Sequence, residues 1–226
     1  MCGRFVAASD PDGLVRFFVV DERKDGDVAP SWNVAPTETV RAVVEHDERR
    51  FLVAFSWGLV PRWAEDRRVA SKMINARSET VADKPAYREA FRRRRCLIPA
   101  DGFYEWQRLA GDARRPHFVY PTDDPVFAFA GLWETWRDPA DPDAEPLRTC
   151  VILTRQADAR IADLHPRMPV ILPPEAWDAW LDRDLADPHA LGSLLAAPPP
   201  QGIGHHAVSA DVNTPRNNHP ELLLPV

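Results

Sequence analysis

Runs of apolar residues along this chain are mostly of the strand type, and they outnumber the helical ones. β-branched and aromatic residues fill 39–46 and 50–60, and the charged turn between these two runs predicts a hairpin. Further strands are predicted at 96–107, 116–121, 126–136, 148–154 and 204–210. Many strands with few helices, in no regular alternation, predict an α+β fold with a mixed, mostly antiparallel sheet.

Helical spacing of apolar residues is confined to short segments. In 83–95, Asp83 is a candidate N-cap, Pro85 lies in the first turn, and arginines gather at the C-terminal end, which together predict a helix. Shorter helices are predicted at 11–20, 157–164, 174–183 and 187–197. The Asp-, Gly- and Pro-rich segment 21–32 is predicted to be a loop. Because no repeat or long linker divides the chain, we expect one domain over 1–226.

Composition places the chain among globular proteins. Of its 226 residues, 45% are hydrophobic and 27% are charged, which is enough apolar material for a substantial core. No stretch approaches the roughly 20 apolar residues of a membrane span, and the first residues lack an export signal. We therefore expect a cytoplasmic protein without a membrane partner. Cys2, Cys96 and Cys150 form no CxxC pair, so neither a disulfide framework nor a zinc–thiolate site is predicted.

Positive charge is concentrated in one part of an acidic chain. The net charge is −6, but residues 60–95 contain eleven Lys and Arg against five Asp and Glu, a local balance of +6. Such a segment is compatible with an anion-binding face, although a solvated helix end is the commoner origin of a basic run.

The second residue is a cysteine, which could become a reactive N-terminal residue. Initiator methionine is removed when the next residue is small, so we expect Met1 to be cleaved and Cys2 to become the first residue. Its α-amine (pKa roughly 7.7–8.0) and thiol (pKa about 8.5) would then form a 1,2-aminothiol, which condenses with an aldehyde to a five-membered thiazolidine. The alternative is an ordinary terminal residue, disordered or packed as a small hydrophobe.

Two further residues are candidates for acid–base chemistry. Strand alternation places Glu105 on the same face as Phe103, and aromatic neighbours would desolvate its carboxyl group and raise its pKa toward the range useful for proton transfer. An outward-facing strand glutamate is the alternative. His165 lies in a proline-braced loop between two apolar segments, which fits a catalytic or a structural role. His46, His117, His189 and His219 are predicted at the surface, and His205 and His206 would point to opposite sides of a strand. No metal-ligand spacing is found, so no metal is expected.

The basic segment also contains candidate nucleic-acid contacts. In an extended conformation Asn75 and Arg77 would share a face, where an amide can orient an amine or carbonyl group and a guanidinium can bind phosphate. Trp57 and Trp63 lie on either side of Arg62 and would provide a base-stacking platform next to a phosphate contact. A turn asparagine, a surface arginine and core-anchoring tryptophans are the ordinary alternatives.

Seven motifs, in order along nearly the whole chain, resemble the SOS response-associated peptidase (SRAP) family, whose members are also called abasic site processing proteins. They are MCGRF (1–5), WNVAPT (32–37), WGLVPRWA (57–64), INARSET (74–80), RRCLIPADGFYEW (94–106), LTRQADARIADLHPRMPVIL (153–172) and VSADVNTPRNNHPELL (208–223). The resemblance implies an α+β pseudo-barrel of mixed sheet with a few peripheral helices and a basic groove.

The resemblance also implies roles for individual residues. In the family, the mature N-terminal cysteine, here Cys2, crosslinks to the aldehyde of an abasic site in single-stranded DNA. The other expected catalytic residues are Asn75, Glu105 and His165, and the expected DNA-binding residues are Arg4, Pro36, Trp57, Arg62, Arg77 and Trp106. Many relatives have an acidic residue after this histidine, whereas this chain has Pro166.

The predicted function is therefore that of an abasic-site sensor in single-stranded DNA. It would form a thiazolidine DNA–protein crosslink through Cys2 and shield the lesion during the DNA damage response, with lyase-like and (auto)peptidase activity. The alternatives are an N-terminal-nucleophile cysteine peptidase and a non-covalent single-stranded DNA-binding module. No cofactor is expected, and we expect a monomer at the nucleoid or replication fork.

Overall fold

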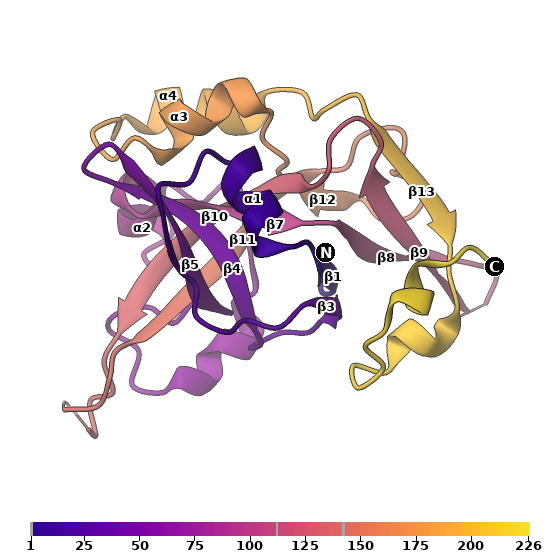
Figure 1. Ribbon diagram of the computed structural model, residues 1–226, viewed down its shortest axis with the longest axis horizontal. Helices are drawn as coiled ribbons and strands as arrows, with labels where there is room; N and C mark the ends of the chain where they lie inside the picture. Colours follow the sequence, from indigo (N-terminus) through magenta and orange to yellow (C-terminus); the bar gives the residue numbers. More distant parts are fainter. Residues whose placement is uncertain (1, 112, 142) are drawn as a thin grey trace.

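The computed structural model describes residues 2–111, 113–141 and 143–226, and strands are its main regular structure (Figure 1). The strands are β1 (Phe5–Ala7), β2 (Glu22–Lys24), β3 (Ser31–Val34), β4 (Thr39–His46), β5 (Arg49–Trp57), β6 (Asn75–Arg77), β7 (Arg95–Ala100), β8 (Gly102–Arg108), β9 (Arg114–Pro121), β10 (Phe127–Trp136), β11 (Leu147–Gln156), β12 (Arg167–Pro169) and β13 (Ile203–Ala207). The helices are α1 (Pro11–Phe17), α2 (Arg88–Arg93), α3 (Trp177–Leu181) and α4 (Pro188–Ala196), with 3₁₀ turns at Arg67–Lys72, Pro174–Ala176, Ala210–Asn213 and Pro220–Leu223.

Two sheets organise these strands. The smaller has the order β13-β9-β8-β1-β3 and is antiparallel throughout. The larger follows the path β12-β11-β10-β7-β4-β5-β2, with β6 beside β11. Parallel pairing of β11 with β5 closes part of the larger sheet into a ring. The predicted α+β class with a mixed, mostly antiparallel and barrel-like sheet is therefore confirmed.

The continuous apolar run of β10 reflects burial on both of its faces. Phe127 and Phe129 pack in a cluster that both sheets share, whereas Ala128 and Ala130 pack in a second cluster beneath the helices. Such double-sided burial replaces the usual apolar–polar alternation of a strand with one face in water. Cys2 and Phe5 belong to the same cluster as Phe127 and Phe129. The shared cluster is therefore where the first residues enter the core.

Three sequence predictions fail at the level of local structure. The helix predicted over 83–95 begins only at Arg88, because the preceding residues form turns, in which the Lys84 N–H donates to the Thr80 carbonyl at 3.1 Å. The helix predicted over 157–164 is a series of turns. The segment 21–32, predicted as a loop, contains β2 and the start of β3. Short elements of this kind depend on pairing partners elsewhere in the fold, which local propensity does not report.

Arg95 anchors the helical layer to the larger sheet, and replacing it should destabilise the fold. Its buried guanidinium donates to the backbone carbonyls of Trp180 (2.6 Å), Phe91 (2.8 Å) and Leu185 (3.0 Å). In Arg95→Met these acceptors lose their donor, so we expect the free energy of unfolding to fall by roughly 3 kcal/mol or more. Urea unfolding should show a lower midpoint, whereas Arg92→Met, at an exposed neighbour, should leave it nearly unchanged.

Candidate functional site

Cys2 is buried, although it stands almost at the start of the chain. It precedes β1, an interior strand between β3 and β8, so the chain enters the core at once. Its side chain is fully buried in the cluster shared by the two sheets, and Sγ lies 3.8 Å from the carbonyl oxygen of Arg4. Burial raises the pKa of the Cys2 thiol well above its usual range. The thiol is therefore protonated at neutral pH. The expected removal of Met1 concerns a residue outside those described.

Pairing of β1 with β8 brings Cys2 to Glu105. Phe5 lies opposite Phe103 in this antiparallel pair, so the residues that precede Phe5 run alongside those that follow Phe103. After burial, the charge of Glu105 is the next largest cause of the raised pKa of the Cys2 thiol, which agrees with this placement. The thiol and the carboxyl group thus belong to one site.

Asn75 holds Cys2 from the side of the larger sheet. It is the first residue of β6, which pairs in parallel with β11. Its Nδ2 donates to the Cys2 carbonyl oxygen at 2.7 Å. Its Oδ1 is buried and accepts no hydrogen bond from any described residue. Asn75 therefore fixes the backbone of Cys2 and keeps one acceptor beside it.

Glu105 and His165 form a pair suited to proton transfer. Glu105 is only 3% exposed, and this burial raises the pKa of its carboxyl group to about 7. His165 Nδ1 lies 4.0 Å from Glu105 Oε1. Burial lowers the pKa of His165, which favours the neutral imidazole at neutral pH. A carboxyl group that titrates near pH 7 beside a neutral imidazole can both donate and accept a proton under ordinary conditions.

His165 takes its orientation from the backbone of its own loop. Its Nδ1 accepts from the Arg167 N–H at 3.0 Å, and the carbonyl oxygen of Pro166 accepts from the Ala157 N–H at 3.0 Å. An acidic side chain at position 166 is thus not required to hold the ring. Arg167 in turn pairs with Glu79 through two contacts, at 2.5 and 2.9 Å, which ties this loop to the segment after β6.

A cavity of about 390 Å³ opens beside this pair. Its walls come from β8, β9 and the loop that carries His165. The lining residues are Glu105, Trp106, Arg108, Arg114, Ala162, Asp163, Leu164, His165 and Pro166. A small polar molecule or part of a larger one can therefore reach the carboxyl group and the imidazole. In the ranges that the structure describes, no three His, Cys, Asp or Glu side chains are grouped to hold a metal ion.

Two of the predicted DNA-binding residues have opposite environments. Arg77 is exposed, two residues along β6 from Asn75, and has no ion pair with any described residue, so it is open to an anion. Trp57 is fully buried: its ring packs edge-on against Phe5 and its Nε1 donates to the Ile74 carbonyl. The expectation that Trp57 supports a base is therefore wrong, because neither face of the ring is accessible.

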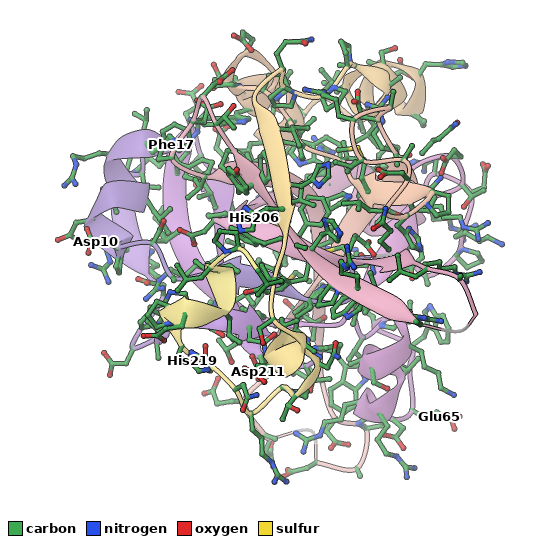
Figure 2. The ribbon with its side chains drawn as sticks, turned by 90° about the vertical axis from the view of Figure 1, so that its right-hand side faces the viewer. Asp10, Phe17, Glu65, His206, Asp211 and His219 are labelled. Atoms are coloured by element: carbon green, nitrogen blue, oxygen red, sulfur yellow. The ribbon has the colours of Figure 1, made fainter. Side chains whose placement is uncertain are left out.

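Arg4 and Arg62 are already engaged by the protein. Arg4 is half-buried, and Nη1 donates to Asn33 Oδ1 at 2.7 Å and to the Val212 carbonyl at 2.9 Å. It thus fastens the C-terminal segment, whose turns with Asp211 and His219 lie near β13 in Figure 2. Arg62 Nε donates to Glu134 at 2.7 Å, but its side chain is 62% exposed, so part of the guanidinium remains available.

Pro36 follows β3 and Trp106 lies in β8, and these two strands flank β1 on opposite sides. Pro36 is half-buried in the turn between β3 and β4, where the following N–H, that of Thr37, donates to the Trp57 carbonyl at 2.7 Å. Trp106 is half-buried on the cavity wall, and its Nε1 donates to Asn213 Oδ1 at 2.7 Å. Of the predicted aromatic contacts, Trp106 therefore has a ring at the cavity.

The sequence does not identify Asn33 as a structural residue, and it predicts His117 at the surface. Asn33 is buried and donates to the carbonyls of Val212, Thr214 and Asn217, so it holds the C-terminal segment; its position inside the WNVAPT motif was the only available signal. His117, predicted at the surface, is buried, since β9 lies between β8 and β13.

Among the described helices, none is long and apolar enough to cross a membrane.

Comparison with known proteins gives consistent matches over the whole chain. A family model described as SOS response associated peptidase (SRAP) matches residues 1–215. Abasic site processing protein YoqW of Bacillus subtilis is 40% identical over 224 residues, which is 99% of each chain. Abasic site processing protein YedK of Escherichia coli is 31% identical over 100% of both chains. A crystal structure of a protein from Bacteroides thetaiotaomicron has the same fold, with a TM-score of 0.85 over 100% of both chains at 22% identity.

Proposed function

Since the chain belongs to the SOS response associated peptidase (SRAP) family, we propose that it processes abasic sites in single-stranded DNA by binding them covalently through Cys2. The observation that carries the proposal is the convergence of Cys2, Asn75, Glu105 and His165 in one site, in which Glu105 and His165 line a cavity. The opened sugar of an abasic site is an aldehyde, and an N-terminal cysteine has the two nucleophiles that condense with it.

The first step is opening of the sugar, because an abasic deoxyribose is mainly a closed hemiacetal. Protonated Glu105 donates its proton to the ring oxygen while its other carboxyl oxygen takes the proton of the C1′ hydroxyl, which breaks the bond from C1′ to the ring oxygen and frees the aldehyde. A carboxyl pKa of about 7 leaves a large protonated fraction at neutral pH, which an ordinary glutamate would lack. The neutral imidazole of His165, whose Nδ1 accepts from the Arg167 N–H, has its proton on Nε2 and can donate a hydrogen bond to the opened sugar oxygen.

Covalent capture then uses both groups of Cys2 after removal of Met1. The α-amine attacks C1′, and loss of one water molecule gives an imine. Sγ adds to the imine carbon and its proton passes to the nitrogen, which closes the thiazolidine. Asn75 favours this sequence because its Nδ2 fixes the Cys2 carbonyl, and its Oδ1, which has no partner among the described residues, would accept from the amine. Well-oriented reactions of this kind reach effective molarities of roughly 10⁵–10⁸ M.

The peptidase alternative is less well supported by the state of the thiol. A cysteine peptidase needs a thiolate, whereas burial raises the pKa of the Cys2 thiol. In the thiazolidine pathway the amine attacks first and the imine nitrogen takes the thiol proton, so no thiolate has to accumulate. The environment of Cys2 therefore fits capture of an aldehyde better than attack on a peptide bond.

The test is to mix the purified protein with single-stranded DNA that carries one abasic site and to run a denaturing gel. We expect a shifted band that resists denaturant and is absent with intact DNA. A non-covalent binding module would give no such band but would retard the DNA on a native gel. A peptidase would cleave a peptide panel whether or not DNA is present. Absence of the denaturant-resistant band would contradict the proposal.

A further inference from the structure

Two arginines that line the cavity, Arg108 and Arg114, lie so close together that a bound anion would stabilise them. Arg108 and Arg114 are the last residue pair of β8 and β9 before their connecting turn, and they lie directly opposite each other. Directly opposed side chains have Cβ atoms about 4.5–5.5 Å apart, and like charges at this spacing destabilise a sheet. Both residues are exposed, and both line the cavity that contains Glu105 and His165.

No described acidic side chain compensates this pair. Neither arginine takes part in an ion pair within the described ranges, whereas Arg167, in the loop that carries His165, pairs with Glu79. Asp163 shares the cavity wall, but its Oδ2 accepts from Gln107 Nε2 at 3.2 Å and it forms no ion pair with Arg108 or Arg114. The positive end of the cavity is therefore open to an anion from outside the protein.

The position of the pair indicates which anion. Arg108 is three residues beyond Glu105 on the same strand, a separation of roughly 10 Å between backbone positions. β8 and β9 run side by side on the right of Figure 1 and pair from Phe103 to Arg108, so this strand pair forms one wall of the cavity between the two points. A DNA strand with its abasic sugar against Glu105 would pass its neighbouring phosphates along this wall.

We propose that Arg108 and Arg114 together bind a backbone phosphate of the DNA strand on one side of the abasic sugar. The inference rests on the proposed function for its ligand but not on covalent chemistry. Two guanidinium groups that face each other across a strand pair can each donate to one phosphate, and the phosphate offsets their mutual repulsion. The pair thus contributes affinity and fixes the course of the strand, whatever its base sequence.

The protein-side test compares Arg108→Gln/Arg114→Gln with Arg93→Gln/Arg183→Gln. The control removes the same charge from two exposed arginines that line a separate hollow. Binding of abasic single-stranded DNA is measured in the Cys2→Ala background over a salt series. We expect binding by the first double variant to weaken about three- to twentyfold, the range for two exposed ion pairs. The slope of log K against log salt should become shallower by roughly 0.7 for each phosphate that the variant no longer neutralises.

The DNA-side test changes the phosphates of the DNA as well as the protein. Single phosphates on either side of the abasic site are replaced, one at a time, by neutral methylphosphonates, and binding is measured with the parent and the Arg108/Arg114 variant. We expect one position at which the neutral group weakens the parent but leaves the variant unaffected. Equal effects at all positions, or equal affinities and slopes for the two double variants, would overturn the inference. Failure of the parent protein to crosslink, with the position-specific effect retained, would overturn the proposed function alone.

Discussion

The Cys2→Ala variant should form no denaturant-stable complex with abasic single-stranded DNA, although it should still bind the DNA on a native gel. Alanine retains the α-amine and therefore the imine, but it has no sulfur to close the ring. The imine is reversible, so the complex should appear only when borohydride reduces it to a stable amine. We expect loss of at least a hundredfold in unreduced complex, measured on a denaturing gel.

A variant with one extra residue ahead of Cys2 provides the matched control for the amine. The thiol remains, but the nitrogen of Cys2 is then an amide and cannot form an imine. This variant should give no denaturant-stable band in the absence of borohydride, because the α-amine of the added residue has no thiol on the neighbouring carbon to close the five-membered ring. Full crosslinking by the extended protein would show that the thiol acts alone, and would rule out the thiazolidine.

The sequence predicts the long strands of this fold better than its shortest elements, for a physical reason visible in β10. Its run of ten residues has an apolar pattern strong enough to be read locally, because both of its faces are buried. The helix expected at 157–164 instead has apolar residues at helical spacing that pack individually from turns. Three-residue strands such as β2 and β6 are defined by their parallel partners β5 and β11, which no local pattern identifies.

In the candidate site, the sequence identifies the reactive residues but not which of them lie close together. The chemistry of Cys2 and Glu105 could be stated from residue type and motif, but their proximity depends on the pairing of β1 with β8. Trp57 was misjudged because a tryptophan in a basic segment looks the same in sequence whether its ring stacks on a base or fills the core. Arg4 was expected to contact phosphate, and its bond to Val212, over two hundred residues away, was beyond any local inference.

Glu105→Gln should slow crosslink formation by roughly 10²–10⁴-fold, the usual contribution of a general acid–base group. Glutamine keeps the shape of the side chain but cannot donate a proton to the ring oxygen. In the parent protein the rate should rise with pH as the α-amine loses its proton, and then bend downward above about pH 7 as Glu105 ionises. The variant should lack the bend and continue to rise toward pH 8, as single-turnover rates on gels would show.

The same substitution should stabilise the protein at high pH. The pKa of Glu105 is about 7 in the folded state against about 4.3 in a free side chain. Below pH 4 the carboxyl group is protonated in both states, and its contribution to the free energy of unfolding is fully present. This contribution is lost as the pH rises through 7, because the buried carboxyl group then ionises. At pH 8, Glu105→Gln should therefore unfold with a free energy higher by on the order of 3 kcal/mol, with little difference at pH 4. Glu175→Gln, at an exposed position, should change neither the rate nor the stability. If Glu105→Gln crosslinks at the parent rate, Glu105 is excluded from catalysis. If the variant is slow but no more stable than the parent at pH 8, the carboxyl group of Glu105 is already ionised in the folded protein well below pH 7.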